Sequence, residues 1–233
     1  MKAAEREYQE IWGKGCFRKT SATHQNAQAE GIEVIPLMWV FTYKFDEDGY
    51  LYKYKARLVA RGDLQEQFGD TYAATLAART FRAVVAIANY FGLELKQYDV
   101  PNAFLNALLD RKLYAETPHV FKEADGDLLE VLRALYGLKD APLLWYNTFR
   151  AAVELLGLKR VEGFPCLYVN DWLILFVYVD DIVIVYHLLN AYLHQDFENK
   201  LKNRFGLIAM GDLSWFLGVR VVRDRQRKKI WLV

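Results

Sequence analysis

Two adjacent aspartates stand at the centre of the most apolar stretch of this chain. The tetrapeptide YVDD at 178–181 separates the runs WLILFV (172–177) and IVIVY (182–186). Both runs are short and rich in β-branched and aromatic residues, which is typical of strands. Two carboxylates among such residues cost free energy unless a positive group meets them. The sequence therefore predicts a β-hairpin with Asp180 and Asp181 at its bend, a suitable platform for Mg²⁺, which prefers oxygen ligands.

Two simpler interpretations of this stretch stay open at this point. Residues 172–189 have about the length of a membrane span. Two central aspartates would, however, cost about 2.5–3.5 kcal/mol each on insertion. The commoner alternative is a plain turn in which the aspartates serve only turn chemistry. The context elsewhere in the chain has to decide between a turn and a metal site.

Composition and charge exclude several classes of protein. Of the 233 residues, 53% are hydrophobic and 15% aromatic, which indicates a folded core rather than disorder. The formal net charge is only +1, but Lys and Arg cluster at 53–61, 200–204 and 220–229. Such clusters either follow a phosphate backbone or are solvated faces. The two cysteines, Cys16 and Cys166, favour a reducing compartment, and the four histidines have no zinc-ligand spacing. The N-terminal residues lack the apolar region of a secretory signal.

The order of the predicted elements favours an α+β fold. We expect an N-terminal helix and polar loop over 1–32, with the loop at 18–31, and a folded domain over 33–233. Within the domain we expect hairpins at 33–60 and 172–186, helices at 80–91, 142–156 and 189–205, a strand before residue 99, and strands near 213–222 and 229–233. Residues 128–135 are ambiguous by periodicity. In the 51–60 strand, Lys53, Lys55 and Arg57 alternate with apolar residues, so they share one face.

A third carboxylate, Asp99, follows the alternating run LELK at 93–96. By itself it is as well explained as the cap of a following helix. Together with Asp180 and Asp181, it predicts three carboxylates on separate strands, enough to hold two Mg²⁺ ions roughly 3.5–4 Å apart. Such a pair activates a 3′-hydroxyl nucleophile and neutralises charge on a leaving pyrophosphate, with no general base required.

At this point the chain resembles the reverse transcriptase domain of copia-type LTR retrotransposons along most of its length. The motifs that carry the resemblance occur in the order of that family. They are WVF (39–41), YKARLVARG (54–62), DV (99–100) with AFLN (103–106), LYGLK (135–139), AP (141–142) with WY (145–146), PCL (165–167), YVDD (178–181), GDL (211–213) and FLG (216–218). Each motif is weak alone, but the ordered set from about 33 to 222 is highly specific.

The resemblance implies a right-hand polymerase fold of palm and fingers, with the thumb largely missing. It implies that Asp99, Asp180 and Asp181 are the catalytic metal-binding residues, with Asp99 and Asp180 as direct ligands. The implied cofactor is Mg²⁺, as two ions, with Mn²⁺ as an alternative. Phe216, Leu217 and Gly218 match the segment that grips the primer.

The resemblance also implies a nucleotide-binding set. Lys55 and Arg57 match basic residues that hold the incoming triphosphate, and Phe104 matches the bulky residue that blocks a ribose 2′-hydroxyl. The turn with Tyr136, Gly137 and Lys139 matches the segment beside the nucleotide and template. Physical chemistry agrees, because cations suit phosphates and a glycine lets backbone approach a ligand.

The chain departs from the family pattern at several positions. Asp140 stands where Gln is usual and Leu143 where Arg is usual, which we expect to weaken nucleic-acid binding electrostatically. Pro101-Asn102 replaces the usual Lys-Thr. From the resemblance, we expect the sequence to end, at Val233, before most of a thumb and all of an RNase H domain. These features are typical of a fragment or a decayed copy of a longer polyprotein.

The expected function is RNA-directed DNA polymerisation, the transfer of a nucleotide from a dNTP to a primer 3′-hydroxyl. The expected partners are an RNA or DNA template with its primer, the dNTP, and RNase H and integrase regions of a parent polyprotein, with no membrane. The expected location is intracellular, in the cytoplasm or in a virus-like particle of a live element. Two alternatives stay open: an inactive remnant that keeps the fold and binds nucleic acid, and an interaction module in which the Asp pair is only a turn.

Overall fold

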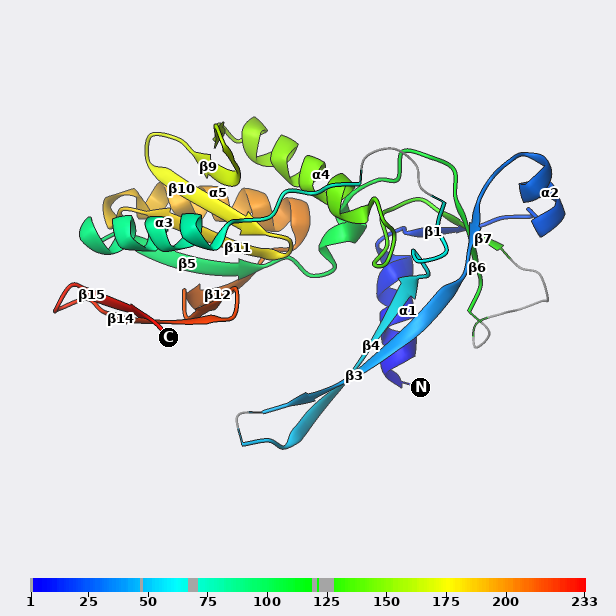
Figure 1. Cartoon of the computed structure of the whole chain (residues 1–233), viewed down its shortest axis with the longest axis horizontal. Coiled ribbons are helices and arrows are strands. Elements are labelled where there is room, and N and C mark those ends of the chain that lie inside the picture. The colour runs from blue at the N-terminus through cyan, green and yellow to red at the C-terminus, as the bar shows by residue number, and fades with distance from the viewer. Residues whose placement is uncertain (1, 47, 67–70, 119–120, 122–127) are drawn as a thin grey trace. The chain divides into compact units, whose positions relative to one another are not determined.

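The computed structural model describes residues 2–46, 48–66, 71–118, 121 and 128–233, which form two compact units. The first unit comprises Met1–Tyr72 and Phe104–Trp145, and the second comprises Ala73–Ala103 and Tyr146–Val233. The observed elements are of mixed α and β type with several sheets (Figure 1). The predicted division at residue 32 stays a prediction.

The first unit contains one four-stranded sheet and one long hairpin. The sheet has the order β1 (Phe17–Lys19), β7 (Leu128–Val131), β6 (Tyr114–Glu116), β2 (Val34–Ile35). The hairpin pairs β3 (Leu37–Phe45) with β4 (Leu51–Ala60), and α1 (Lys2–Gly13) packs beside β4. A 3₁₀ helix, η1 (Ala103–Asn106), begins at the boundary of the units. The predicted N-terminal helix and the 33–60 hairpin are confirmed.

The expected polar loop over 18–31 is wrong in part. The segment begins within β1 and also forms α2 (His24–Ala29). Thr23 caps this helix, because its hydroxyl accepts a hydrogen bond from the Asn26 backbone N–H at 3.2 Å. The helix has only six residues, too few for a clear hydrophobic period. The short strand β1 depends on pairing with β7, far along the chain, which local patterning does not reveal.

The second unit is built on a six-stranded antiparallel sheet. Its order is β12 (Ile208–Asp212), β5 (Glu94–Asp99), β11 (Asp181–Tyr186), β10 (Leu173–Tyr178), β9 (Phe164–Val169), β8 (Lys159–Val161). The central strands β10 and β11 are apolar on both faces because helices cover both (Figure 1). The stretch 172–189 is therefore a hairpin and not a membrane helix. No helix among the described residues has the length and apolar character needed to cross a membrane.

Helices pack on opposite faces of this sheet. On one face, Phe81 of α3 (Ala78–Tyr90) contacts Phe176 at 6.0 Å between ring centroids. On the other, His194 of α5 (Ala191–Phe205) stacks on Tyr186 at 4.0 Å. The helix α4 (Ala141–Leu155) begins in the first unit and continues in the second, and a short η3 (Leu188–Asn190) precedes α5. This packing fixes the register of the strands that carry the aspartates.

A small C-terminal sheet completes the second unit, in the order β13 (Trp215–Phe216), β14 (Val219–Asp224), β15 (Lys229–Leu232). Phe216 is fully buried and lies between Phe81 and Phe176, 5.2 Å from each ring centroid. Arg225, in the turn between β14 and β15, holds Glu94 of β5 with two hydrogen bonds, of 2.5 and 2.8 Å. Phe216 thus anchors β13 beside Phe81 and Phe176, and Arg225 anchors the β14–β15 turn to β5.

Candidate active site

The three predicted aspartates converge at one end of the six-stranded sheet. Asp181, the first residue of β11, is the direct cross-strand partner of Asp99, the last residue of β5. The Val100 backbone N–H donates a hydrogen bond to the Asp180 carbonyl oxygen at 2.9 Å. Directly paired residues have Cβ atoms about 4.5–5.5 Å apart. The expectation that Asp99 lies far from the Asp pair, which the interpretation as a lone turn made, is therefore wrong.

The turn that carries Asp180 holds an unusual backbone conformation. Tyr178 pairs with Asp181, so Val179 and Asp180 form a two-residue hairpin turn. Val179 has φ of 57°, in the left-handed region, and a β-branched residue is a genuine outlier there. A positive φ at the first turn position only is the pattern of a type II′ turn, which normally has glycine at that place. The fold thus stores backbone strain beside the carboxylates.

The electrostatic environment of Asp181 opposes its ionisation. Burial raises the pKa of the Asp181 carboxyl, and the neighbouring Asp180 and Asp99 raise it further. A hydrogen bond from Gln97 acts in the opposite direction. Gln97 and Asp99 are two apart on β5, so they face the same side, and this period-two spacing is the signal by which sequence reasoning could have found Gln97.

Three carboxylates have the right donor chemistry for Mg²⁺, but their side chains are not gathered into a coordination shell. Within the described residues, no group of three or more His, Cys, Asp or Glu side chains is placed to hold a metal ion. The strands therefore bring the three aspartates to one end of the sheet, whereas their side chains are not arranged around a common point. A divalent cation would offset the repulsion among these carboxylates, so the donor set fits the expected ion chemically.

A pocket of about 440 Å³ opens beside Asp181 in the second unit. The residues predicted to grip the primer, Phe216, Leu217 and Gly218, line it together with Asp181. Leu217 and Gly218 have φ of 51° and 75°, and Phe216 pairs with Val219, so the two residues form a tight turn. Further lining residues that the sequence analysis missed are Gln97, Tyr178, Met210, Ser214 and Trp215.

Three residues of the predicted nucleotide-binding set meet in the first unit. The Phe104 ring lies 4.6 Å from the Tyr136 ring, between centroids. The Arg57 guanidinium lies 5.7 Å from the Tyr136 centroid, a cation–π distance. The Ala60 backbone N–H donates to the Tyr136 carbonyl oxygen at 2.7 Å, which ties the turn after β7 to the end of β4. Sequence positions far apart therefore form one aromatic and cationic cluster.

The two other predicted residues of this turn have structural roles. Gly137 has φ of 94°, and a Cβ at this position would overlap the Ala60 carbonyl oxygen. Lys139 is held by Gln65, since its backbone N–H donates to Gln65 Oε1 at 2.7 Å and its Nζ donates to the Gln65 carbonyl oxygen at 2.6 Å. The ammonium of Lys139 therefore fastens the turn to the segment after β4.

Lys55 lies in a field of like charges on β4. Burial lowers the pKa of the Lys55 ammonium, and Arg57, Lys44 and Lys53 lower it further, while Glu7 of α1 raises it. Cations that repel one another in this way gain free energy when a polyanion such as a triphosphate binds. The strand predicted over 51–60 is confirmed as β4, so Lys53, Lys55 and Arg57 lie on one of its faces.

The acid at Asp140, expected to weaken nucleic-acid binding, is not an isolated charge. Asp140 Oδ2 accepts a hydrogen bond from Arg111 Nε at 3.2 Å. Arg111 also pairs with Glu33 at 3.2 Å, and all three side chains are largely buried. Much of the charge of Asp140 is thus offset within the first unit, and the expected electrostatic penalty is correspondingly smaller.

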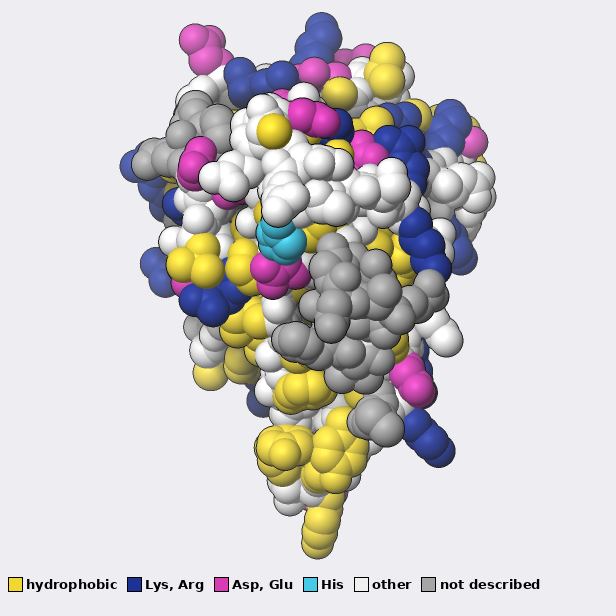
Figure 2. Space-filling view, turned by 90° about the vertical axis from the view of Figure 1, so that its right-hand side faces the viewer, with side chains coloured by type: hydrophobic (Ala, Val, Ile, Leu, Met, Phe, Trp, Pro, Cys, Tyr) yellow, Lys and Arg dark blue, Asp and Glu magenta, His cyan; other side chains and the backbone are white. Residues whose placement is uncertain are grey.

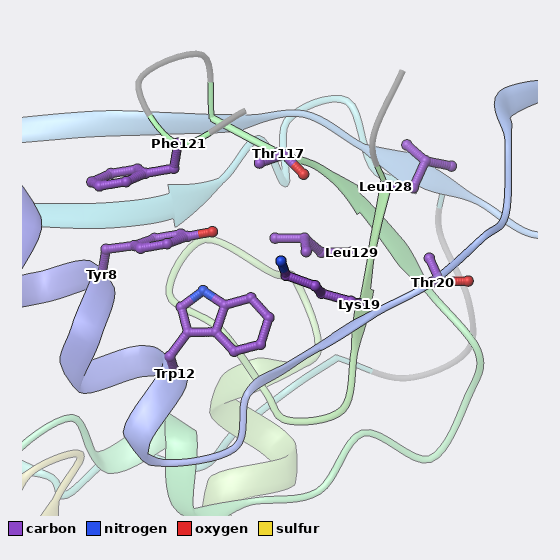
Figure 3. Close-up of a pocket in the computed structure, with 8 residues that line it drawn as sticks. All are labelled: Tyr8, Trp12, Lys19, Thr20, Thr117, Phe121, Leu128 and Leu129. Carbon is purple, nitrogen blue, oxygen red and sulfur yellow. The ribbon is translucent and has the colours of Figure 1, made fainter. Parts of the chain in front are cut away.

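A second cavity, of about 300 Å³, lies against α1 in the first unit (Figure 3). Tyr8 and Trp12 project into it from one face of the helix, and Tyr8 stacks on Phe121 at 4.0 Å between centroids. The Lys19 side chain points toward the space between these rings and Leu129. The sequence alone did not single out these residues, because it indicated only a helix at this place.

Comparison with known proteins agrees with the ordered motifs and the convergent aspartates. The reverse transcriptase (RNA-dependent DNA polymerase) family model matches residues 25–233. The chain belongs to this family. The resemblance to copia-type elements is confirmed by relatives that are Pol polyproteins of such transposons.

The relatives are much longer than this chain. The retrovirus-related Pol polyprotein from transposon TNT 1-94 of Nicotiana tabacum is 30% identical over all of this chain and 18% of its own length. That from transposon RE2 of Arabidopsis thaliana is 31% identical over 84% of the chain and 14% of its own length. The Transposon Ty1-DR4 Gag-Pol polyprotein of Saccharomyces cerevisiae is 28% identical over 74% of the chain and 11% of its own length. The chain thus spans under a fifth of these relatives.

Proposed function

We propose that this chain is the polymerase portion of a copia-type Pol polyprotein, with the second unit as palm and the first unit as fingers. Its reaction would join a deoxynucleotide to a primer 3′-hydroxyl, directed by an RNA or DNA template. The single observation that carries the proposal is the direct pairing of Asp99 with Asp181 beside the turn that holds Asp180.

Within this proposal the second unit supplies the carboxylates and the primer contact. Asp99, Asp180 and Asp181 would hold two Mg²⁺ ions, which when bound lower the pKa of the attacking hydroxyl and neutralise the leaving pyrophosphate. Gln97 orients the Asp181 carboxylate through its hydrogen bond. The pocket beside Asp181, with the Leu217-Gly218 turn at its edge, has the size and lining to take the primer end.

The first unit would bind the nucleotide through charge and shape. Lys55 and Arg57 lie on the same face of β4 and suit the phosphates, since repulsion among them is relieved by an anion. Phe104, buried and packed on Tyr136, provides a rigid wall of the kind that excludes a ribose 2′-hydroxyl. Gly137 keeps this wall close to the end of β4.

A second candidate is an inactive remnant that retains the fold and binds nucleic acid. It is favoured by the attachment of the Lys139 ammonium to the Gln65 carbonyl oxygen, which occupies a side chain predicted to contact the nucleotide. RNase H and integrase partners from the same polyprotein belong to this proposal as well as to the first, because the relatives extend far beyond the matched region.

Primer extension on an RNA template, with and without Mg²⁺, tests the proposal. We expect Asp180→Asn to reduce extension roughly 10²–10³-fold, because one anionic ligand is lost. Asp171→Asn, at the exposed opposite end of the same hairpin, is the matched control and should extend at the parent rate. Extension that survives Asp180→Asn would contradict the metal role. A parent chain that binds the primed template but never extends it would establish the remnant.

A further inference from the structure

Gln65 is a buried polar side chain to which the proposed function gives no role. It follows β4 in the first unit and is 5% exposed. Its Oε1 accepts a hydrogen bond from the Lys139 backbone N–H at 2.7 Å, and its Nε2 donates to Asp140 Oδ1 at 3.4 Å. Its backbone carbonyl oxygen accepts from Lys139 Nζ at 2.6 Å. One residue after β4 therefore holds two consecutive residues of the turn that carries Tyr136.

A largely buried ionic network holds Asp140 from its other side. Arg111 donates to Asp140 Oδ2 through Nε and to Glu33 Oε2 through Nη1, both at 3.2 Å. Glu33 Oε1 accepts from the backbone N–H of Glu66 at 2.9 Å, which returns the network to the residue beside Gln65. Charge-assisted hydrogen bonds in such places are strong and hold a fixed geometry. The acid at 140, which departs from the family pattern, is therefore a bound part of this network.

The segment after β4 also holds the start of the turn, through its backbone. The Ala60 N–H donates to the Tyr136 carbonyl oxygen at 2.7 Å, and a Cβ at Gly62 would overlap the Gly137 carbonyl oxygen. The Tyr136 ring in turn packs on Phe104 at 4.6 Å between centroids. Contacts this close leave little room for one segment to shift without the other. The position of the Tyr136 ring therefore depends on how residues 60–66 hold residues 136–140.

Selection between deoxyribonucleoside and ribonucleoside triphosphates needs a positioned wall rather than charge. Both kinds of triphosphate carry the same charge, so an electrostatic field attracts them alike. In Figure 2, basic and acidic side chains are interspersed over the face shown. Gln65 is too deeply buried to contact a nucleotide itself, so it acts on a bound nucleotide through the turn that it holds.

We propose that Gln65 is a positioning residue for sugar discrimination. By holding Lys139 and Asp140, it keeps the Tyr136 ring packed on Phe104, the proposed wall against a ribose 2′-hydroxyl. The inference rests on the proposed function for the identity of that wall. It goes beyond that function by assigning specificity to a buried residue behind the nucleotide-binding turn.

Equilibrium dialysis of dTTP and UTP, with Mg²⁺, tests the proposal. The chain is bound to an RNA template whose primer ends in a dideoxynucleotide before a template adenine, so that no bond forms. We expect the parent to prefer dTTP, and Gln65→Leu to lower the ratio of the two affinities about 10- to 100-fold, because misplaced positioning contacts cost up to about that much. Gln195→Leu, which removes an exposed amide from α5, is the matched control and should keep the parent ratio.

An exchange of donor and acceptor separates positioning from loss of stability. Gln65→Glu places a carboxylate oxygen against Asp140 Oδ1, so the two repel and the ratio should fall. Combined with Asp140→Asn, the new amide donates to the new carboxylate, and the net charge is that of the parent. The ratio for this double variant should return to within about 2-fold of the parent. Urea unfolding verifies that each variant is folded.

Three results would overturn the proposal. One is a folded Gln65→Leu variant that keeps the parent ratio, and another is one that weakens both triphosphates by the same factor, since the network would then be purely structural. The third is a folded double variant that discriminates no better than Gln65→Glu alone. If Gln65→Leu does not fold, the comparison of Gln65→Glu with the double variant decides.

The inference and the proposed function can fail separately, because extension is measured in parallel with an unblocked primer. If the parent prefers dTTP but never extends the primer, only the polymerase activity falls, and the affinity ratios still decide the role of Gln65. If the parent extends primers while Gln65→Leu keeps the parent ratio, only the inference falls. A parent that binds neither triphosphate would overturn both.

Discussion

At the scale of single residues, the backbone at Val179 carries strain that a glycine would relieve. A left-handed conformation costs an L residue roughly 1–2 kcal/mol, a cost that glycine avoids. Glycine also loses more conformational entropy on folding, which offsets part of that gain. We expect Val179→Gly to raise the free energy of unfolding by about 0.5–1 kcal/mol relative to Val179→Ala, which keeps a Cβ. Urea unfolding of the two variants checks this, and a glycine variant less stable than the alanine variant would refute it.

Gly137 is fixed by contact as well as by conformation. Its φ of 94° disfavours any side chain, and a Cβ would also overlap the Ala60 carbonyl oxygen. We expect Gly137→Ala to destabilise the chain by about 2–4 kcal/mol, since both strain and overlap must be relieved. Gly49, with φ of 84° and no atom within 4 Å of its would-be Cβ, isolates the conformational part. Gly49→Ala should cost only about 1 kcal/mol in the same urea measurement. Equal costs for the two variants would rule out the overlap.

At the scale of elements, α5 is tied to β5 by a buried polar contact. The Tyr98 hydroxyl lies 2.7 Å from His194 Nε2 and 3.2 Å from Glu198 Oε2, and Tyr186 stacks on the His194 ring. Burial lowers the pKa of His194, and Lys96 lowers it further, whereas Glu198 opposes the shift. Tyr98 neighbours Asp99, so this contact holds the strand that carries a predicted metal ligand.

The pH dependence of stability follows from that lowered pKa. The unfolded chain, with a histidine pKa near 6.5, binds the proton more readily than the folded chain. The contribution of neutral His194 to the free energy of unfolding is therefore fully present above pH 6.5, and it is lost as the pH falls below that value. We expect the parent to lose more unfolding free energy between pH 7.5 and 5.5 than His194→Gln, whose amide stays neutral. Urea unfolding at both pH values measures this loss of unfolding free energy. His24→Gln is the control, and it should lose as much as the parent.

The elements themselves were predictable to different degrees. The hairpin at 172–186 and the strand ending at Asp99 were predicted correctly, because alternation and β-branched runs are local signals. Residues 128–135 are ambiguous by pattern alone, and pairing of β7 with β1 and β6 decides for a strand over the first four, 128–131. The exposed strand β12 was not predicted, since its identity depends on pairing with β5.

At the scale of the whole chain, net charge is a poor guide to binding. The sum is only +1, yet the β3–β4 strands carry four cations and no acid, while acids such as Asp140 and Glu94 are offset by Arg111 and Arg225. Local clusters therefore decide where a polyanion binds. Because the chain spans under a fifth of its relatives, further activities of those polyproteins remain proposals for it.

The sequence by itself determined the family, the acidic hairpin and the alternation of cations and rings on β4, because ordered motifs and period-two patterns are local properties of the chain. Only the tertiary structure decided that Asp99 pairs directly with Asp181, that Tyr136 contacts both Phe104 and Arg57, and that Phe41 and Tyr43 of β3 are exposed. The physical reason is that each of these depends on which distant segments pack together, and burial is settled by that packing rather than by any local pattern.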